Sequence, residues 1–212
     1  KNVVRQSIET SLQCLQKASI ELLSLHQTDE YIIHNSDFWE VINEFKERNI
    51  IHLFGVSVYE VENARELINE YGDFIDFIQI PYNIFDRRFD QIASLLTEKN
   101  IDVVSRSAYL KGIITIVEQE IPKELSNIKK FKRKLADLAE SLNFNVQMLA
   151  LLFVLNKEYI STTILGVNNT KEIEENVQAL SKRGQLLDYE ELLRELSIKD
   201  EFLIDPRRWK SI

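Results

Sequence analysis

The sequence predicts an α/β fold built on a parallel sheet. Amphipathic stretches of helical length alternate with short apolar runs that are rich in Ile, Val and Phe. These runs lack polar alternation, as expected of strands buried on both faces, and they occupy 20–25, 50–57, 74–80, 101–105 and 161–167. The resulting βα order is typical of a doubly wound open sheet or of a barrel.

Helices are predicted between the strands. The first begins at Ser7 and runs into the strand that stops at His26. The later amphipathic stretches occupy 36–49, 60–72, 89–100, 123–143 and 145–158. Several of them end on Asn or Gly just before the next strand, as helix stops do, and Asn143 separates the last two.

The choice between open sheet and barrel depends on motifs and length. No GxGxxG turn follows any predicted strand, which weakens the dinucleotide-binding open sheet. A (β/α)8 barrel normally needs about 250 residues, and this chain has 212, with five predicted strands. We therefore expect a single domain, 1–212, that lacks about three βα units before Lys1. Its first strand would need cover from an N-terminal segment or from self-association.

Composition excludes several partner classes. The net charge of -8 argues against a nucleic-acid or anionic-membrane partner, and the basic run 129–134 is predicted to be a solvated helix face. No apolar run has the length of a membrane span or the pattern of a signal peptide, so a cytoplasmic protein is predicted. Cys14 is the only cysteine, which excludes an internal disulfide, and its apolar neighbours predict burial.

Several segments together resemble successive parts of the aldo-keto reductase barrel. Segment 7–26 resembles the lead into that family's fourth strand, and the tail IDPRRW (204–209) resembles a bacterial subgroup of the family. The intervening matches are GVSVYEVENARELI (55–68), DFIQIPYNIFDRR (76–88), VVSRSAYLKGIIT (103–115) and ILGVNNTKEIEENVQAL (164–180). The resemblance implies a (β/α)8 TIM barrel that uses NADP or NAD to reduce a small-molecule carbonyl to an alcohol.

The resemblance gives His26 a catalytic role. It directly follows a strand, where barrel enzymes place their sites, and would orient the substrate carbonyl through a hydrogen bond. A histidine at a strand end can also simply cap a backbone group. The family's catalytic Tyr, Lys and Asp belong to the first three βα units, so we expect this chain alone to be inactive.

Three residues resemble the family's contacts to the nicotinamide ring. Ser57 and Gln79 match positions that bind its carboxamide, which has both donor and acceptor groups. Val58 replaces the asparagine that usually follows the serine. Arg106 stands where many relatives stack an aromatic ring, and a guanidinium can stack on a flat heterocycle. Without the resemblance, Gln79 is a satisfied interior polar residue and Arg106 a solvated or salt-bridged cation.

Other residues match the family's contacts to the remainder of the cofactor. Ser107, Tyr109 and Gly112 match its pyrophosphate loop, although the same residues also suit an ordinary strand-to-helix turn. Gly166 leads toward a predicted helix capped by Asn169 or Thr170, whose N-terminus can receive phosphate, and Glu175 and Asn176 match the adenosine-binding pair.

The cofactor preference departs from the NADPH-selective pattern. Gly166 and Glu172 stand where such relatives carry Lys and Arg. A carboxylate repels a 2′-phosphate, whereas the adjacent Lys171 can compensate for it, so the cofactor choice stays open with a slight preference against strict NADPH use.

Two rival functions remain open. One is a truncated, non-catalytic barrel that acts as a nucleotide-binding or protein-interaction module. The other is an isomerase or aldolase barrel with a phosphate site, although the sequence lacks an obvious catalytic lysine at a strand end. No metal site is predicted, because the spacing of His26, His34 and His52 fits no ligand pattern. A serine hydrolase is not predicted either, because the sequence lacks the GxSxG elbow of such enzymes.

Tyr31, Phe38 and Trp39 either line a substrate slot or pack on the neighbouring helix.

Overall fold

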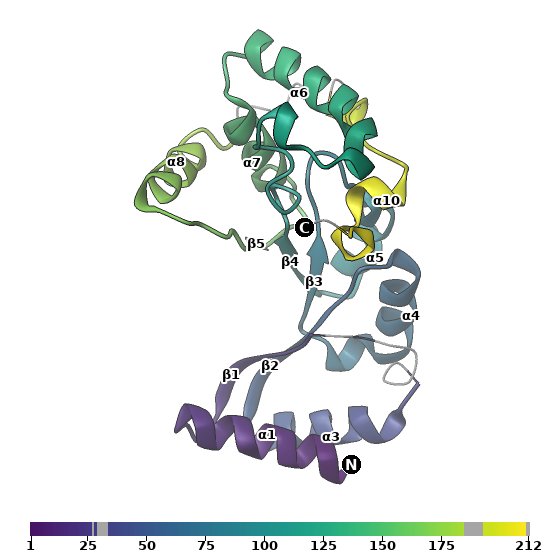
Figure 1. Cartoon of the computed structure of the whole chain (residues 1–212). Coiled ribbons are helices and arrows are strands. Elements are labelled where there is room, and N and C mark those ends of the chain that lie inside the picture. Colours follow the sequence, from purple (N-terminus) through teal and green to yellow (C-terminus); the bar gives the residue numbers. More distant parts are fainter. Residues whose placement is uncertain (27, 29–33, 185–192, 211–212) are drawn as a thin grey trace. The chain divides into compact units, whose positions relative to one another are not determined.

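The computed structural model describes residues 1–26, 28, 34–184 and 193–210, and it confirms an α/β fold with a parallel sheet. The strands follow one another in sequence order (Figure 1): β1 (Ile20–Leu25), β2 (Ile51–Ser57), β3 (Phe77–Pro81), β4 (Asp102–Arg106) and β5 (Thr162–Thr163). β5 is much shorter than the predicted run 161–167. Ile164 and Val167 are 50% and 43% exposed, so burial does not hold that run as a strand.

The helices lie close to the predicted stretches. They are α1 (Asn2–Leu15), α3 (Ser36–Glu47), α4 (Val61–Tyr71), α5 (Ala93–Glu98), α6 (Lys129–Ser141), α7 (Val146–Leu155), α8 (Thr170–Leu180) and α10 (Glu201–Ile204). Short 3-10 turns accompany them: η1 (Gly72–Phe74), η2 (Arg88–Ile92), η3 (Glu118–Glu120), η4 (Lys123–Ile128) and η6 (Pro206–Arg208). Asn49, Asn100 and Asn143 follow α3, α5 and α6 with φ of 54°, 57° and 61°. These left-handed asparagines confirm the predicted helix stops.

The chain divides into two compact units. The first unit comprises residues 1–80 and 89–104, and the second comprises 81–88 and 105–212. That 1–212 forms a single domain stays a prediction.

An aromatic cluster forms the core of the first unit. Trp39, 2% exposed, stacks on Tyr71 with ring centroids 4.4 Å apart, and its edge meets Phe54 at 6.0 Å. Phe38 is also buried. Of the two interpretations of these aromatics, packing on the helix is therefore the one that the structure supports, while Tyr31 lies outside the described residues.

Gly55 lets β2 and β3 approach one another in that core. It pairs with Phe77 in the sheet, and a Cβ on Gly55 would lie 2.4 Å from the Phe77 ring. No real Cβ tolerates such a contact, so the ring occupies the space that a side chain would need.

Helix α1 contacts α3 through ion pairs, and only one of its residues is buried. Ile8 is its one buried residue, whereas Arg5 pairs with Glu44, and the Lys1 ammonium lies 2.6 Å from Glu40. A groove of about 580 Å³ is lined by residues of α1, β1, β2 and α3, including Ile8, Leu23, Leu25, Phe38, Ile42 and Phe54.

The predicted burial of Cys14 is wrong: its thiol is exposed on α1, because the helix turns that side to solvent.

Helix α7 forms the core of the second unit. Its sequence is apolar all round, which is the pattern of a fully buried helix, and Leu149–Val154 are all at most 2% exposed. It packs against α6 and α8 (Figure 1), and Phe153 stacks on Tyr82 at 5.6 Å.

Within the described residues no single helix is long and apolar enough to span a membrane. The bent pair Lys123–Ser141 and Val146–Leu155 has the length and composition of a span, and this is the whole of its support.

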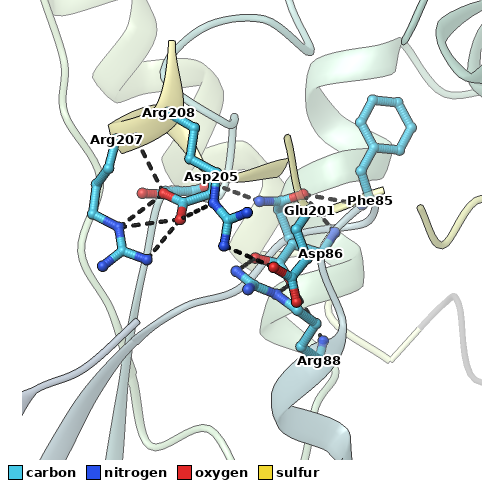
Figure 2. A network of polar contacts seen from close by, with 9 residues as sticks. Phe85, Asp86, Arg88, Glu201, Asp205, Arg207 and Arg208 are labelled. Carbon is cyan, nitrogen blue, oxygen red and sulfur yellow. Dashed lines mark hydrogen bonds and ion pairs between the residues drawn. The ribbon is translucent and has the colours of Figure 1, made fainter. Parts of the chain in front are cut away.

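A network of paired charges holds the C-terminal segment of the second unit (Figure 2). The buried Asp205 carboxylate accepts hydrogen bonds from Arg207 and Arg208 and caps η6 at the Arg207 N–H. Asp86, also fully buried, accepts two bonds from Arg88, at 2.9 and 3.0 Å.

These two carboxyl groups are shifted in opposite directions. Burial raises the pKa of Asp86 against the pull of Arg88. Burial also acts to raise the pKa of Asp205, but its bonds to Arg207 outweigh that and leave the pKa below its usual value.

Candidate cofactor and active site

The first unit brings three predicted residues to one edge of the sheet. Ser57 ends β2 and pairs with Gln79 of β3, and the Ser57 hydroxyl donates to Gln79 Oε1 at 3.4 Å. His26 directly follows Leu25, the last residue of β1, which pairs with Val56. His26 therefore comes level with Ser57. Since the carboxyl ends of parallel strands carry the sites of such folds, this edge is the candidate active-site edge.

Two hydrogen bonds join the chain segments that meet at this edge. The Val58 N–H donates to the Gln79 carbonyl at 3.0 Å, and the Thr28 hydroxyl donates to the Ser57 carbonyl at 3.2 Å. Ser57 is 2% exposed, whereas the His26 side chain is exposed. An exposed imidazole at a fixed strand end can meet a ligand from solvent, and the neighbouring Ser–Gln pair offers a donor and an acceptor.

The second unit contains an unusual loop after β4. Arg106 is the last residue of β4, and Ser107, Leu110, Lys111 and Gly112 follow it with φ of 63°, 47°, 52° and 87°. Left-handed backbone is costly for every one of these residues except glycine. An added Cβ at Gly112 would meet nothing within 4 Å, so one side of the loop is open for close approach by a ligand.

Tyr109 connects this loop to α8. Its hydroxyl donates to Asn176 Oδ1 at 2.8 Å, across a small gap of about 10 Å³ that Glu175 and Gln147 also line. Burial raises the pKa of Tyr109 from 10.0 to about 12, opposed by Gln147 and helped by the charge of Glu175. The hydroxyl therefore stays protonated at neutral pH and acts as a fixed donor.

The N-terminus of α8 is closed by a reciprocal cap. Asn169 is the N-cap, and its side chain accepts from the Glu172 N–H at 3.1 Å, while the Glu172 carboxylate accepts from the Asn168 N–H at 2.7 Å. Of the two predicted caps, Asn169 rather than Thr170 takes the position. Gly166 is exposed before this helix, and nothing lies within 4 Å of an added Cβ there.

Sequence reasoning missed Asn83 and Lys132. Asn83 is fully buried and donates from Nδ2 to the Ser107 carbonyl at 3.1 Å. Lys132 lies in the basic run predicted to be solvated, but its ammonium is half-buried and donates to carbonyls of the loop after β4. Asn83 could have been recognised as a turn residue, because its Oδ1 accepts from the nearby Phe85 N–H, but that pattern does not indicate the bond to Ser107. No local signal could have found Lys132, whose acceptors lie 16 to 19 residues away.

The described residues offer one grouping of metal-ligand types. The exposed side chains of His34, Glu66 and Glu70 place ligand atoms within 4.8 Å of one another. Exposed acidic groups commonly gather without an ion, and the prediction of no metal site stays a prediction.

Comparison with known proteins decides the family. Residues 1–192 match the family model described as aldo/keto reductase family. The chain belongs to the aldo/keto reductase family. The predicted resemblance is confirmed.

Curated relatives of this chain are oxidoreductases. It is 23% identical over 202 residues to an uncharacterized oxidoreductase, YqkF, of Bacillus subtilis, covering 86% of this chain and 62% of that protein. It is 22% identical over 213 residues to an L-galactose dehydrogenase of Arabidopsis thaliana, covering 96% of this chain and 64% of that protein. The chain thus spans just under two thirds of the length of these relatives.

Solved structures of aldo-keto reductases share the fold. The holo form of aldo-keto reductase AKR11C1 from Bacillus halodurans matches with a TM-score of 0.76 and 20% identity, over 97% of this chain and 70% of that one. A thermostable aldo-keto reductase, Tm1743, in complex with the inhibitor epalrestat, matches with a TM-score of 0.70 and 20% identity, over 91% of this chain and 65% of that one. The neighbours support a TIM-barrel architecture of the aldo-keto reductase type.

Proposed function

We propose that this chain forms the cofactor-binding part of an NAD(P)H-dependent reductase that converts a small-molecule carbonyl into an alcohol. Ser57 and Gln79 would bind the nicotinamide carboxamide, and Arg106 would stack on the ring. Pyrophosphate and adenosine would be held by Ser107, Tyr109, Gly112, Gly166, Glu175 and Asn176. The hydrogen bond from Tyr109 to Asn176 carries the proposal, because it joins two segments that were assigned to adjoining parts of one cofactor.

The residues present suit such a cofactor. Gly112 leaves open space beside a loop of left-handed residues, and Ser107 contributes a hydroxyl. When bound, the reduced nicotinamide supplies the hydride for carbonyl reduction. His26 would donate a hydrogen bond to the carbonyl oxygen and so orient the substrate. Tyr109 is unsuited to the general-acid step, since its pKa is about 12 and its proton is committed to Asn176.

We propose that the chain does not depend strictly on NADPH and can also accept NADH. The Glu172 carboxylate stays at the start of α8, fixed there by the Asn168 N–H. A negative charge held at this place disfavours a 2′-phosphate and tolerates a 2′-hydroxyl.

Titration of the chain with NADH and NADPH, followed by nicotinamide fluorescence, tests the proposal. We expect binding by the wild type and an affinity loss of about tenfold in the double variant Ser107→Ala and Asn176→Ala, because two hydrogen bonds are removed. Asn43→Ala, which alters only an exposed bond to Glu47 on α3, is the control. Unchanged affinity in the double variant would refute the assignment.

A further inference from the structure

Lys132 holds the end of the loop that follows β4. Its ammonium donates to the carbonyls of Ile113, Ile114 and Ile116 at 2.6, 2.7 and 2.8 Å. An ammonium has three donors, so this set of carbonyls satisfies all of them. A lysine in the first turn of α6 is also unfavourable beside the positive end of the helix, and burial lowers its pKa. The three loop carbonyls, together with the charge of Glu118, oppose these two penalties.

Asn83 holds the beginning of the same loop. Its Nδ2 donates to the Ser107 carbonyl at 3.1 Å, while its Oδ1 accepts from the Phe85 and Asp86 N–H groups, both at 3.0 Å. Phe85 in turn accepts from the Ile198 N–H at 2.8 Å, next to the charge network of Figure 2. The Asn83 side chain is thus fixed before it reaches Ser107.

The loop needs such support because its conformation is strained. Ser107, Leu110 and Lys111 are left-handed without being glycine, and such residues persist only where their surroundings hold them. The loop's own turns, from Leu110 N–H to Ser107 O and from Gly112 N–H to Tyr109 O, are local and can re-form in other conformations. Besides the bond from Tyr109 to Asn176, Asn83 bonds the beginning of the loop and Lys132 bonds its end to distant parts of the second unit.

We propose that Lys132 and Asn83 are positioning residues for the cofactor, which hold the 107–116 loop in the conformation that receives a pyrophosphate. This inference rests on the proposed function. Neither side chain would touch the cofactor, since the Lys132 ammonium and the Asn83 Nδ2 donate to loop carbonyls and the Asn83 Oδ1 accepts from Phe85 and Asp86. Their effect should therefore fall on ligands that contain the pyrophosphate and spare those that reach only α8.

The test compares Lys132→Met with Lys134→Met. Lys134 lies on the same helix, is mostly exposed and is 3.8 Å from Glu195, so its substitution removes an equal charge without touching the loop. The ligands are ADP-ribose, which contains the pyrophosphate, and adenosine, which does not. We expect Lys132→Met to weaken ADP-ribose binding about tenfold or more, because bonds from a charged donor are lost, and to leave adenosine binding unchanged. Lys134→Met should alter neither.

Asn83→Asp provides a second variant, which turns the attraction between the side chain and the Ser107 carbonyl into a repulsion. It keeps an oxygen acceptor for the Phe85 and Asp86 N–H groups and removes the donor to Ser107. We expect weaker ADP-ribose binding and unchanged adenosine binding, with faster amide exchange in 107–116 in both the Asn83 and Lys132 variants.

Three results would overturn or separate the proposals. Equal losses for ADP-ribose and adenosine would indicate a general structural role and overturn the positioning role. Affinity and exchange in Lys132→Met that match Lys134→Met would overturn it as well. A wild-type chain that binds neither ligand would refute the proposed function, and amide exchange, measured without ligand, would still decide whether Lys132 holds the loop.

Discussion

The two units differ in the polar side chains that they bury. Among the described residues, the buried polar or charged side chains are Ser57 in the first unit and, in the second, Asn83, Asp86, Arg87, Ser105 and Asp205. Both units bury stacked aromatic rings, Trp39 on Tyr71 in the first and Tyr82 on Phe153 in the second, but the ion pairs of the first unit are at least partly exposed, as with Lys1 and Glu40.

This difference follows from what each unit has to position. Apolar packing is non-directional and tolerates small shifts, which suits a core that only supports three strand ends. Hydrogen bonds and ion pairs in a buried setting are directional, and leaving one unmade is costly. The second unit carries the strained loop proposed to bind the charged part of the cofactor, so directional bonds are the appropriate means of holding it.

The largest expected effect breaks the charge network of the second unit. Asp205→Asn should reduce the free energy of unfolding by about 2–4 kcal/mol, because Arg207 and Arg208 lose a buried carboxylate partner. Urea unfolding at neutral pH measures this. Because the pKa of Asp205 is lowered in the fold, its contribution is present above the unfolded value of 3.8 and is lost as pH falls through the folded value. The gap between variant and wild type should therefore close in strong acid, and a gap independent of pH would contradict the account.

A smaller effect is expected from overpacking the first unit. Gly55→Ala should destabilise the chain by about 1–3 kcal/mol, because the new Cβ displaces the buried Phe77 ring. Gly166→Ala is the matched control, since its Cβ meets open space. Thermal unfolding of both variants tests the difference, and equal midpoints would show that the Phe77 ring moves aside freely.

The smallest expected effect concerns the pH dependence of stability that Tyr109 of the second unit contributes. The pKa of Tyr109 is raised to about 12, so the fold keeps its proton while the unfolded chain releases it near 10.0. The contribution of this group is present below pH 10 and is lost as pH rises toward 12. Tyr109→Phe should therefore show a shallower loss of stability between pH 10 and 12 than the wild type. Identical slopes in chemical denaturation across this range would show that the fold does not raise the pKa of Tyr109.

Much of the fold could be predicted because it depends on local patterns. Apolar runs and asparagine stops determined the first four strands and most helix ends within a few residues. β5 is shorter than predicted. The length of a strand depends on the elements that pack against it, and the composition of the strand alone does not describe these. Cys14 was misjudged for a similar reason, since its apolar neighbours Leu12 and Leu15 lie on a helix that buries only Ile8.

For the candidate site, the sequence indicated the residues but not the bonds that support them. The family resemblance located the residues, and the structure brings Ser57 against Gln79 and Tyr109 against Asn176. Their roles stay predictions. Supporting bonds such as that of Lys132 join segments far apart in sequence, and no spacing rule encodes them.

Each unit carries its own natural fluorophore. The chain has two tryptophans: Trp39 stacks on Tyr71 in the first unit, and Trp209 in the second donates its indole N–H to the Phe202 carbonyl at 2.7 Å. Trp39→Phe and Trp209→Phe would each leave one emitter, so the optical signal of either unit can be followed alone. Two superimposable emission curves would mean that the stacked core and the charged network melt in one step, and two separate curves would give each unit its own melting point.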